Sequence, residues 1–153
     1  MAMKCGCPGS AMQDLRGKKA KAGAKAGKSA RQESELRQWP LQLHLVGAGA
    51  PYFENADLLI AADCVPFAYA NFHPDFVKGR AVVIGCPKLD ETEHYVETIA
   101  EIIKEGKVKS VTVAHMEVPC CFGIQSIAEE AVRKSGRKIP VKEEIITVDG
   151  RKQ

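Results

Sequence analysis

Short apolar runs of strand length alternate with longer amphipathic stretches from Leu41 almost to the end of the chain. The runs are rich in β-branched residues, which favour strands, and they cover residues 41–46, 57–63, 81–85, 110–115 and 144–148. Strand, helix and strand in this order predict a mostly parallel sheet of about five strands with right-handed crossovers. We therefore expect an α/β fold, flavodoxin-like or Rossmann-like, with helices flanking the sheet.

Two helices between these strands have clear sequence signals. Asp90 is placed to cap the first helix, with Glu93 completing a capping box and Gly106 ending it. The second helix follows Pro119 and ends at Gly136. The expected apolar faces consist of Val96, Ile99, Ala100 and Ile103 in the first helix, and of Ile124, Ile127, Ala128, Ala131 and Val132 in the second.

The first strand, 41–46, is a special case. About ten residues separate it from the second strand, fewer than a parallel crossover usually needs. We expect it to be antiparallel or an addition at the sheet edge.

Composition divides the chain into three parts. Residues 1–14 carry Cys5 and Cys7, residues 15–38 form a basic low-complexity linker, and residues 39–153 form the α/β domain. The tract from Gly17 to Ala30 consists almost wholly of Gly, Ala, Lys and Ser and lacks the apolar periodicity of a core element. Such a tether would let Cys5 and Cys7 fold back onto the domain.

The net positive charge of the chain comes from this linker. Seven of the 22 basic residues lie between Leu15 and Gln32, where there is no acid. The remaining 15 basic residues stand against 19 acids, so the rest of the chain has a formal charge of −4. We therefore do not expect a broad nucleic-acid-binding face.

The sequence also bears on the cellular compartment. The longest apolar stretch, 58–70, is interrupted by Asp63 and Pro66 and is too short for a membrane span. The N-terminus lacks the apolar core of a secretion signal. We expect a cytoplasmic protein with no membrane partner, in which thiols stay reduced instead of forming disulfides.

Six cysteines occupy four places in the chain, and most of them directly follow a predicted strand. Cys64, Cys86 and the pair Cys120 and Cys121 stand at strand ends, whereas Cys5 and Cys7 lie near the N-terminus. Ligands of open α/β sheets bind beyond the carboxyl ends of the strands. These thiols are therefore predicted to gather at one sheet edge, with Cys5 or Cys7 as a further ligand.

Four thiolates suit a [4Fe-4S] cluster, and they also suit a tetrahedral zinc site. The chain has no C-x2-C pair, the usual spacing of structural zinc sites, which favours the cluster. Taken singly, Cys64 also fits a small buried residue at a strand end. Adjacent side chains point in different directions, so Cys120 and Cys121 are not expected to be equivalent ligands.

Five sequence blocks resemble the C-terminal region of ferredoxin-type iron-sulfur proteins of anaerobic bacteria and archaea. The blocks are GCPGS at 6–10, ESELRQWPLQLHLV at 33–46, PYFENADLLIAADCVPFAY at 51–69, GCPKLD at 85–90 and MEVPCCFG at 116–123. In that family the region follows a two-cluster ferredoxin module with C-x2-C-x2-C-x3-C runs. This chain has no such run, so it is either a shorter relative or part of a longer protein. The small subunit of nickel-iron hydrogenases is similar at the level of the fold, with a Gly-Cys-Pro loop at strand ends.

The resemblance implies iron-sulfur binding and electron transfer in anaerobic metabolism, with a ferredoxin module or an oxidoreductase as the redox partner. The ligands carried over by motif are Cys7, Cys64, Cys86 and one of Cys120 or Cys121. On this reading the chain is an electron carrier or an oxidoreductase subunit.

Two alternatives stay open. In the first, the protein is a redox enzyme for a thiol or disulfide substrate, because the vicinal cysteines resemble the Cys-Cys-Gly motif of heterodisulfide reductases, with Phe122 intervening here. In the second, it is a scaffold whose thiols hold zinc or no metal.

Overall fold

The computed structural model describes residues 10–17 and 32–153. Its main strands are β3 (Asp57–Ala62), β4 (Ala81–Gly85), β5 (Ser110–Met116) and β6 (Val141–Ile146). Its helices are α1 (Val65–Ala68), α2 (Thr92–Glu105) and α3 (Gly123–Ser135), with shorter helical turns at 51–53, 73–77 and 119–121. A two-residue ladder pairs β1 (Gln13–Asp14) with β2 (Gln38–Trp39) and joins the two sides of the predicted linker.

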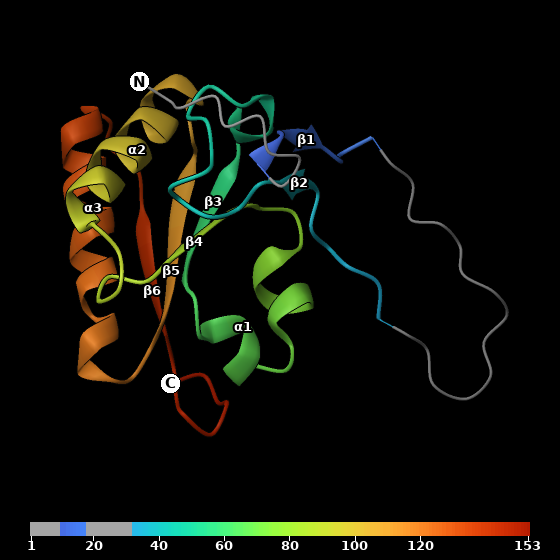
Figure 1. Cartoon of the computed structure of the whole chain (residues 1–153), viewed down its shortest axis with the longest axis vertical. Coiled ribbons are helices and arrows are strands. Elements are labelled where there is room, and N and C mark those ends of the chain that lie inside the picture. Colours follow the sequence, from blue (N-terminus) through green and yellow to red (C-terminus); the bar gives the residue numbers. More distant parts are fainter. Residues whose placement is uncertain (1–9, 18–31) are drawn as a thin grey trace, which may run out of the picture.

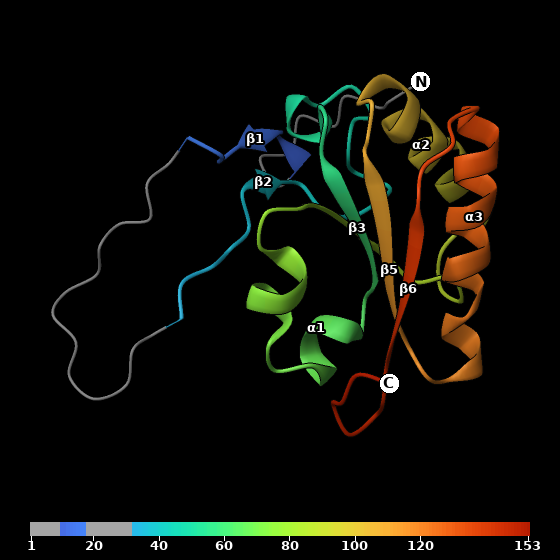
Figure 2. The ribbon, with the colours of Figure 1, turned by 180° about the vertical axis from the view of Figure 1, so that it is seen from behind.

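The four main strands form one parallel sheet in the order β4-β3-β5-β6. At its centre, Ile60 of β3 pairs with Val83 of β4 on one side and with Val113 of β5 on the other. The two long helices, α2 and α3, pack together on one side of the sheet, whereas α1 and the turn at 73–77 lie on the other side (Figures 1 and 2). This arrangement confirms the predicted α/β architecture, with one fewer strand in the sheet than expected.

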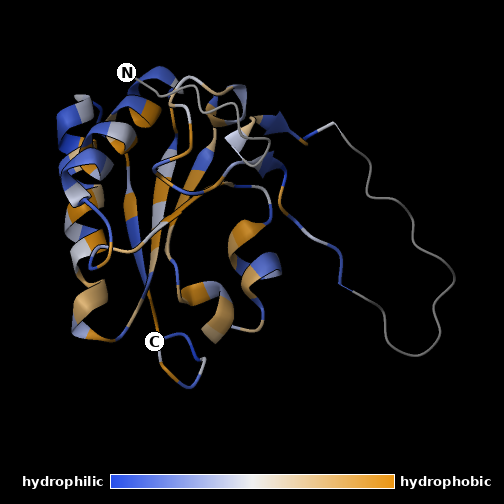
Figure 3. Ribbon diagram, in the orientation of Figure 1, coloured by the Kyte–Doolittle hydropathy of each residue, from blue (hydrophilic) through white to orange (hydrophobic). Residues whose placement is uncertain are grey.

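Apolar side chains of the sheet and the two long helices form the core. Residues 58–61 of β3 are completely buried, as are Ile99, Ile102 and Ile103 of α2 and Ile124 and Ala128 of α3. Apolar and polar colours alternate around α2 and α3 in Figure 3, as expected for helices with one face on a sheet. Both predicted helices, and the faces predicted for them, are confirmed.

The predicted strand 41–46 is wrong. Only Gln42 makes a bridge, a parallel one to Ile84 at the β4 edge, and the chain then turns. The Gln42 side chain causes the turn, because its Oε1 accepts a hydrogen bond from the backbone N–H of His44 at 2.5 Å. The Gln42 carbonyl accepts two more, from Leu45 and Val46. A side chain that bonds its own backbone competes with strand pairing here.

The predicted cap of α2 is also wrong. The helix begins at Thr92 without a side-chain cap, because the Asp90 carboxylate accepts hydrogen bonds from Tyr95 and from the backbone of Cys86. Gly106 and Gly136 do cap the two helices at their C-termini. Only Gly136 uses the left-handed region, with φ of +74°, whereas Gly106 has φ of −75°.

An ion-pair network on β6 ties the C-terminal turn to the sheet. The Glu144 carboxylate lies 2.5 Å from Lys142 Nζ and 3.4 Å from Lys152 Nζ. Burial acts to raise the pKa of Glu144, but the hydrogen bonds and charges of the two lysines outweigh it and hold this pKa below its ordinary value.

Glu144→Gln is expected to lower the free energy of unfolding by about 1 kcal/mol at neutral pH, a small value because water screens both lysines. Since the folded-state pKa is depressed, the stabilisation exists above the unfolded-state pKa and is lost as the pH falls through the folded-state value. Urea unfolding between about pH 3 and pH 7 should show the difference only at the upper end. The exposed Glu101→Gln is the control. A variant that matched the unchanged protein at pH 7 would contradict the prediction.

Candidate functional site

The sheet order reverses direction between β3 and β5. The chain leaves β3 through α1 toward β4 on one side, and it passes from β4 through α2 to β5 on the other side of β3. The carboxyl ends of the strands beside such a switch point are where open α/β sheets bind ligands. This edge lies at the bottom of Figure 1, next to α1 and the C-terminal turn.

The predicted cysteines lie at this edge. Cys64 follows β3 at the start of α1 and is exposed, and Cys86 follows β4 directly and is half-buried. In the turn after β5, Cys120 is exposed and Cys121 is buried. The two adjacent thiols therefore have different environments, as predicted.

The loops after β4 and β5 approach each other closely. A Cβ atom placed on Gly123, just after the cysteine pair, would lie 3.4 Å from Cβ of Pro87 in the loop after β4. The pKa of the Cys121 thiol is raised, mainly by burial and further by the thiols of Cys120 and Cys64, against a lowering hydrogen bond at the backbone of Met116.

The Cys86 loop is held by a carboxylate network. The Asp90 Oδ2 atom accepts hydrogen bonds from the Cys86 backbone N–H at 3.1 Å, from the Tyr95 hydroxyl and from Gln42 Nε2 at 3.4 Å. These bonds from Tyr95 and Cys86 hold the pKa of Asp90 below its ordinary value. The Asp90 N–H in turn donates to the Cys86 carbonyl at 3.1 Å. The loop that carries Cys86 is therefore closed on itself and tied to α2.

The glycine before Cys86 makes room for this network. A Cβ atom on Gly85 would lie 2.6 Å from both Cε2 and the hydroxyl oxygen of Tyr95, a distance that side chains do not tolerate. Gly85 lies in β4 and its φ is not positive. A glycine is needed at this position because the Tyr95 ring occupies the space that a side chain would fill.

Asp63 brings a further carboxyl group next to the thiols. It precedes Cys64, and its Oδ1 atom is buried with no hydrogen-bond partner among the described residues. Burial raises the pKa of Asp63, and the charge of Asp90 raises it further. Asp63 therefore holds its proton more strongly than an exposed aspartate, which suits it to proton exchange with a neighbouring group.

Another carboxylate at this edge, Glu117, has a structural role. Glu117 accepts hydrogen bonds from the Val148 backbone at 2.8 Å and from Gln153 Nε2 at 3.3 Å, so it fixes the C-terminal turn. His115, buried on β5, has its Nε2 atom 2.8 Å from Glu143 Oε1 and meets the Phe122 ring edge-on. Through its contact with Phe122, His115 packs against the turn that carries Cys121.

The remaining predicted ligands have no described position. Cys5 and Cys7 lie outside the described residues. Within residues 10–17 and 32–153, no three His, Cys, Asp or Glu side chains lie close enough together to hold one metal ion. A four-iron cluster spreads its ligands more widely than a single ion, so this finding concerns single-ion sites.

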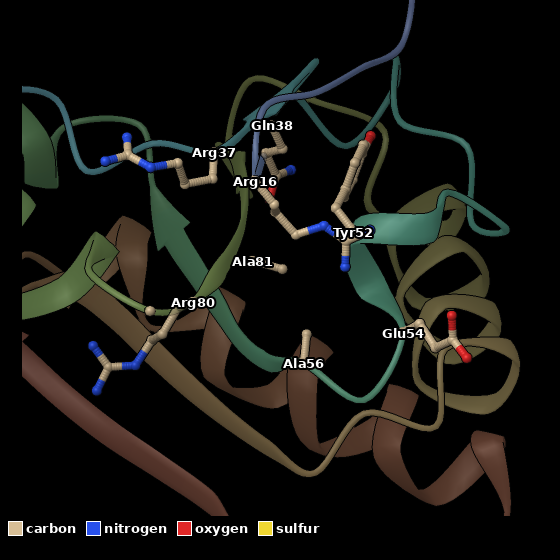
Figure 4. A pocket seen from close by; sticks show the side chains of 9 residues that line it. Arg16, Arg37, Gln38, Tyr52, Glu54, Ala56, Arg80 and Ala81 are labelled. Atoms are coloured by element: carbon tan, nitrogen blue, oxygen red, sulfur yellow. The ribbon is translucent and has the colours of Figure 1, made fainter. Parts of the chain in front are cut away.

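A separate pocket of about 220 Å³ lies at the opposite, amino edge of the sheet, beside Ala56 and Ala81. Figure 4 shows the side chains of Arg37 and Arg80 directed away from these two alanines. Arg16 crosses the pocket, and its guanidinium pairs with the Asp14 carboxylate at 2.5 Å. The pocket lies at the sheet edge opposite to Cys64, Cys86, Cys120 and Cys121.

Sequence reasoning missed Gly85, Tyr95 and Gln42 as parts of the site. Their hydrogen bonds join residues as far apart in sequence as 42 and 95, so no local sequence pattern predicts them. The one available signal was the Gly-Cys-Pro loop followed four residues later by an aspartate.

The part of the chain that the structure describes contains no helix long and apolar enough to cross a membrane.

Comparison with known proteins agrees with this architecture. A protein of Archaeoglobus fulgidus, known as an uncharacterized protein, is 34% identical over 116 residues, which cover 76% of this chain and 81% of that protein. No significant match to a solved structure was found. The family model of the Rossmann-like domain matches residues 50–152, which include every strand of the parallel sheet. The chain therefore belongs to the Rossmann-like domain family.

Proposed function

We propose that this protein binds a [4Fe-4S] cluster at the carboxyl edge of its sheet and transfers single electrons to a redox partner in the cytoplasm of an anaerobe. The observation that carries this proposal is that cysteines follow β3, β4 and β5 at one edge of the parallel sheet, with the loops after β4 and β5 close together. Thiolates are the usual ligands of such clusters, and the cluster, when bound, takes up and releases one electron.

The structure favours Cys121 over Cys120 as the ligand from the loop after β5. The Cys121 thiol lies near enough to Cys64 for the two charges to interact, whereas Cys120 is exposed. Metal binding would remove the proton of the Cys121 thiol although the pKa of this thiol is raised. Cys64, Cys86 and Cys121 would then supply three ligands from neighbouring loops.

Cys7 is the proposed fourth ligand, as the GCPGS block implies. It precedes Asp14 by seven residues, so an extended chain spans up to roughly 24 Å between them. Asp14 pairs with Gln38, whose side chain bonds both the N–H and the carbonyl of Val82 in β4, the strand that leads to Cys86.

The network around Asp90 would position Cys86 and tune its sulfur. Because Asp90 fixes the loop through the Cys86 backbone, the thiol is directed before any metal arrives. Partners beyond the ligands usually contribute 10- to 100-fold to metal affinity.

Metal analysis after anaerobic reconstitution with iron and sulfide tests the proposal. We expect a brown protein with about four irons per chain and, after reduction, an electron paramagnetic resonance signal from a [4Fe-4S] cluster. A colourless protein without iron would disprove it. Zinc in anaerobically isolated protein, with stability lost on chelation, would instead support a zinc scaffold.

A second candidate function is thiol–disulfide chemistry at Cys120 and Cys121. It is favoured by the pairing of an exposed thiol with an adjacent buried one, since an accessible sulfur and a protected resolving sulfur are what such exchange requires. Replacing Cys120 alone distinguishes the two functions. Retention of the cluster together with loss of disulfide reduction would support the enzyme.

A further inference from the structure

Residues 147–153 form a tight turn after β6, which we call the C-terminal strap. Its own backbone closes the turn, because the Thr147 N–H donates to the Arg151 carbonyl at 2.8 Å and the Gly150 N–H donates to the Thr147 carbonyl at 2.9 Å. The Arg151 N–H in turn donates to the Thr147 hydroxyl at 2.9 Å. These internal bonds make the strap one unit.

One flank of the strap is bound to the loop after β5. Glu117, the first residue after that strand, accepts hydrogen bonds from the Val148 N–H at 2.8 Å and from Gln153 Nε2 at 3.3 Å. These two donors lie near opposite ends of the strap, so one carboxylate holds both ends. The Glu117 N–H also donates to the Ile146 carbonyl at 2.9 Å. Cys120 follows Glu117 by only three residues.

The other flank of the strap lies against α1, the helix that follows β3 (Figures 1 and 2). A Cβ atom on Gly150 would lie 2.5 Å from the Ala68 carbonyl oxygen, and the φ of +84° at Gly150 also favours glycine. Ala68 ends α1, and its N–H donates to the Cys64 carbonyl at 3.1 Å. Lys152 adds a contact on this flank, with Nζ 4.9 Å from the centre of the Phe76 ring. A path of contacts therefore leads from the strap to Cys64.

We propose that the C-terminal strap positions the Cys64 loop relative to the loop that carries Cys120 and Cys121. The ladder between β3 and β5 ends at Ala61 and Ala114, so backbone pairing between these strands does not extend to the thiols. The strap links the two loops beyond the end of the ladder. This role rests on the proposed cluster, which needs its ligands at a fixed spacing. Holding that spacing in the empty protein leaves less disorder to be lost when the cluster binds.

Hydrogen–deuterium exchange of the empty protein tests the link. In Gly150→Ala, the new methyl group would overlap the Ala68 carbonyl oxygen and push the strap away from α1. We expect amide exchange to become about fivefold faster at 65–69 and also at 117–122, which lies on the opposite flank of the strap. The matched control is Gly136→Ala, at a similarly strained φ of +74° but with no atom within 4 Å of the new Cβ. It should leave exchange in both segments unchanged.

Glu117→Ala tests the link from the other flank. It removes both side-chain hydrogen bonds to the strap, so exchange should again become about fivefold faster at 65–69, far along the chain from the substitution. Glu117→Gln keeps an oxygen that can accept from the Val148 N–H and should change exchange at 65–69 less. Faster exchange confined to the flank that carries each substitution would overturn the inference.

Cluster affinity in the same variants connects the strap to the site. After anaerobic reconstitution, Gly150→Ala and Glu117→Ala should each bind the cluster about tenfold more weakly, as when a partner of a ligand is removed. The double variant should lose little more than either single variant, because the first substitution already frees the strap. A loss of about a hundredfold in the double variant would mean that the two flanks act independently, which would also overturn the inference. If the protein without substitutions bound no cluster, the proposed function would be wrong, whereas the exchange experiment would still decide whether the strap links the two loops.

Discussion

Gly85→Ala is expected to lower the free energy of unfolding by about 3 kcal/mol, near the top of the usual range for an overpacked core. The new methyl group would lie 2.6–2.7 Å from three atoms of the Tyr95 side chain. That ring cannot step aside at low cost, because it is completely buried and its hydroxyl is bonded to Asp90. Urea unfolding followed by circular dichroism measures the loss.

Gly49→Ala is the matched control for this substitution. No atom lies within 4 Å of a Cβ at Gly49 and its φ is not positive, so the change should stay within about 0.5 kcal/mol. The double variant Gly85→Ala, Tyr95→Leu should lose less stability than the two single variants added together, because both act on one contact. Strict additivity of the two losses would show that the Tyr95 ring is not the obstacle.

We expect that replacing any one of Cys7, Cys64, Cys86 or Cys121 with serine lowers the affinity for the cluster by more than about 100-fold. This loss is larger than the 10- to 100-fold loss usually caused by removing a residue that hydrogen-bonds to a ligand. Each substitution removes the only external ligand of one iron. Cys5→Ser and Cys120→Ser should retain the cluster and are the controls of the same chemistry. Iron and sulfide content, with the paramagnetic signal, measure the outcome.

Asp90→Ala should lower the affinity for the cluster more than the two control substitutions and less than the four ligand substitutions. It leaves every thiol in place but frees the Cys86 backbone, so a 10- to 100-fold loss of cluster affinity is expected. Equal iron retention in all six cysteine variants would contradict the ligand assignment. A cluster lost with Cys120→Ser and kept with Cys121→Ser would reverse the assignment within that pair.

The parallel sheet could be predicted because its signals are local. The strands β3, β4 and β5 are apolar runs of the right length, and α2 and α3 have an apolar face and a terminal glycine. The last strand was predicted at 144–148 but lies at Val141–Ile146, because its exposed edge position accepts the charged residues 142–144. The error at 41–46 arose from a single side chain, since Gln42 satisfies backbone groups that a strand would have used. Hydrophobic pattern alone does not reveal such competition.

The site could be predicted only as far as strand order allowed. A cysteine after a parallel strand must lie at the carboxyl edge, so Cys64, Cys86 and the Cys120 pair were placed correctly. The role of Asp90 was not predictable, because a capping motif and a loop-closing carboxylate look alike until the Tyr95 hydroxyl is located. The order β4-β3-β5, which puts the switch point of the sheet beside Cys64, also depends on long-range pairing that the sequence does not display.

Because the thiols lie at separate strand exits, binding of the proposed cluster would be linked to folding. Cys64, Cys86 and Cys121 are at least 22 residues apart in sequence and come together only when β3, β4 and β5 are aligned. A cluster that binds only the folded chain raises the free energy of unfolding by an amount that depends on the ratio of free cluster concentration to Kd. It would also crosslink the loops of three strands. The loaded protein should therefore melt at a higher temperature than the empty one, with loss of iron and loss of the sheet occurring as a single cooperative event.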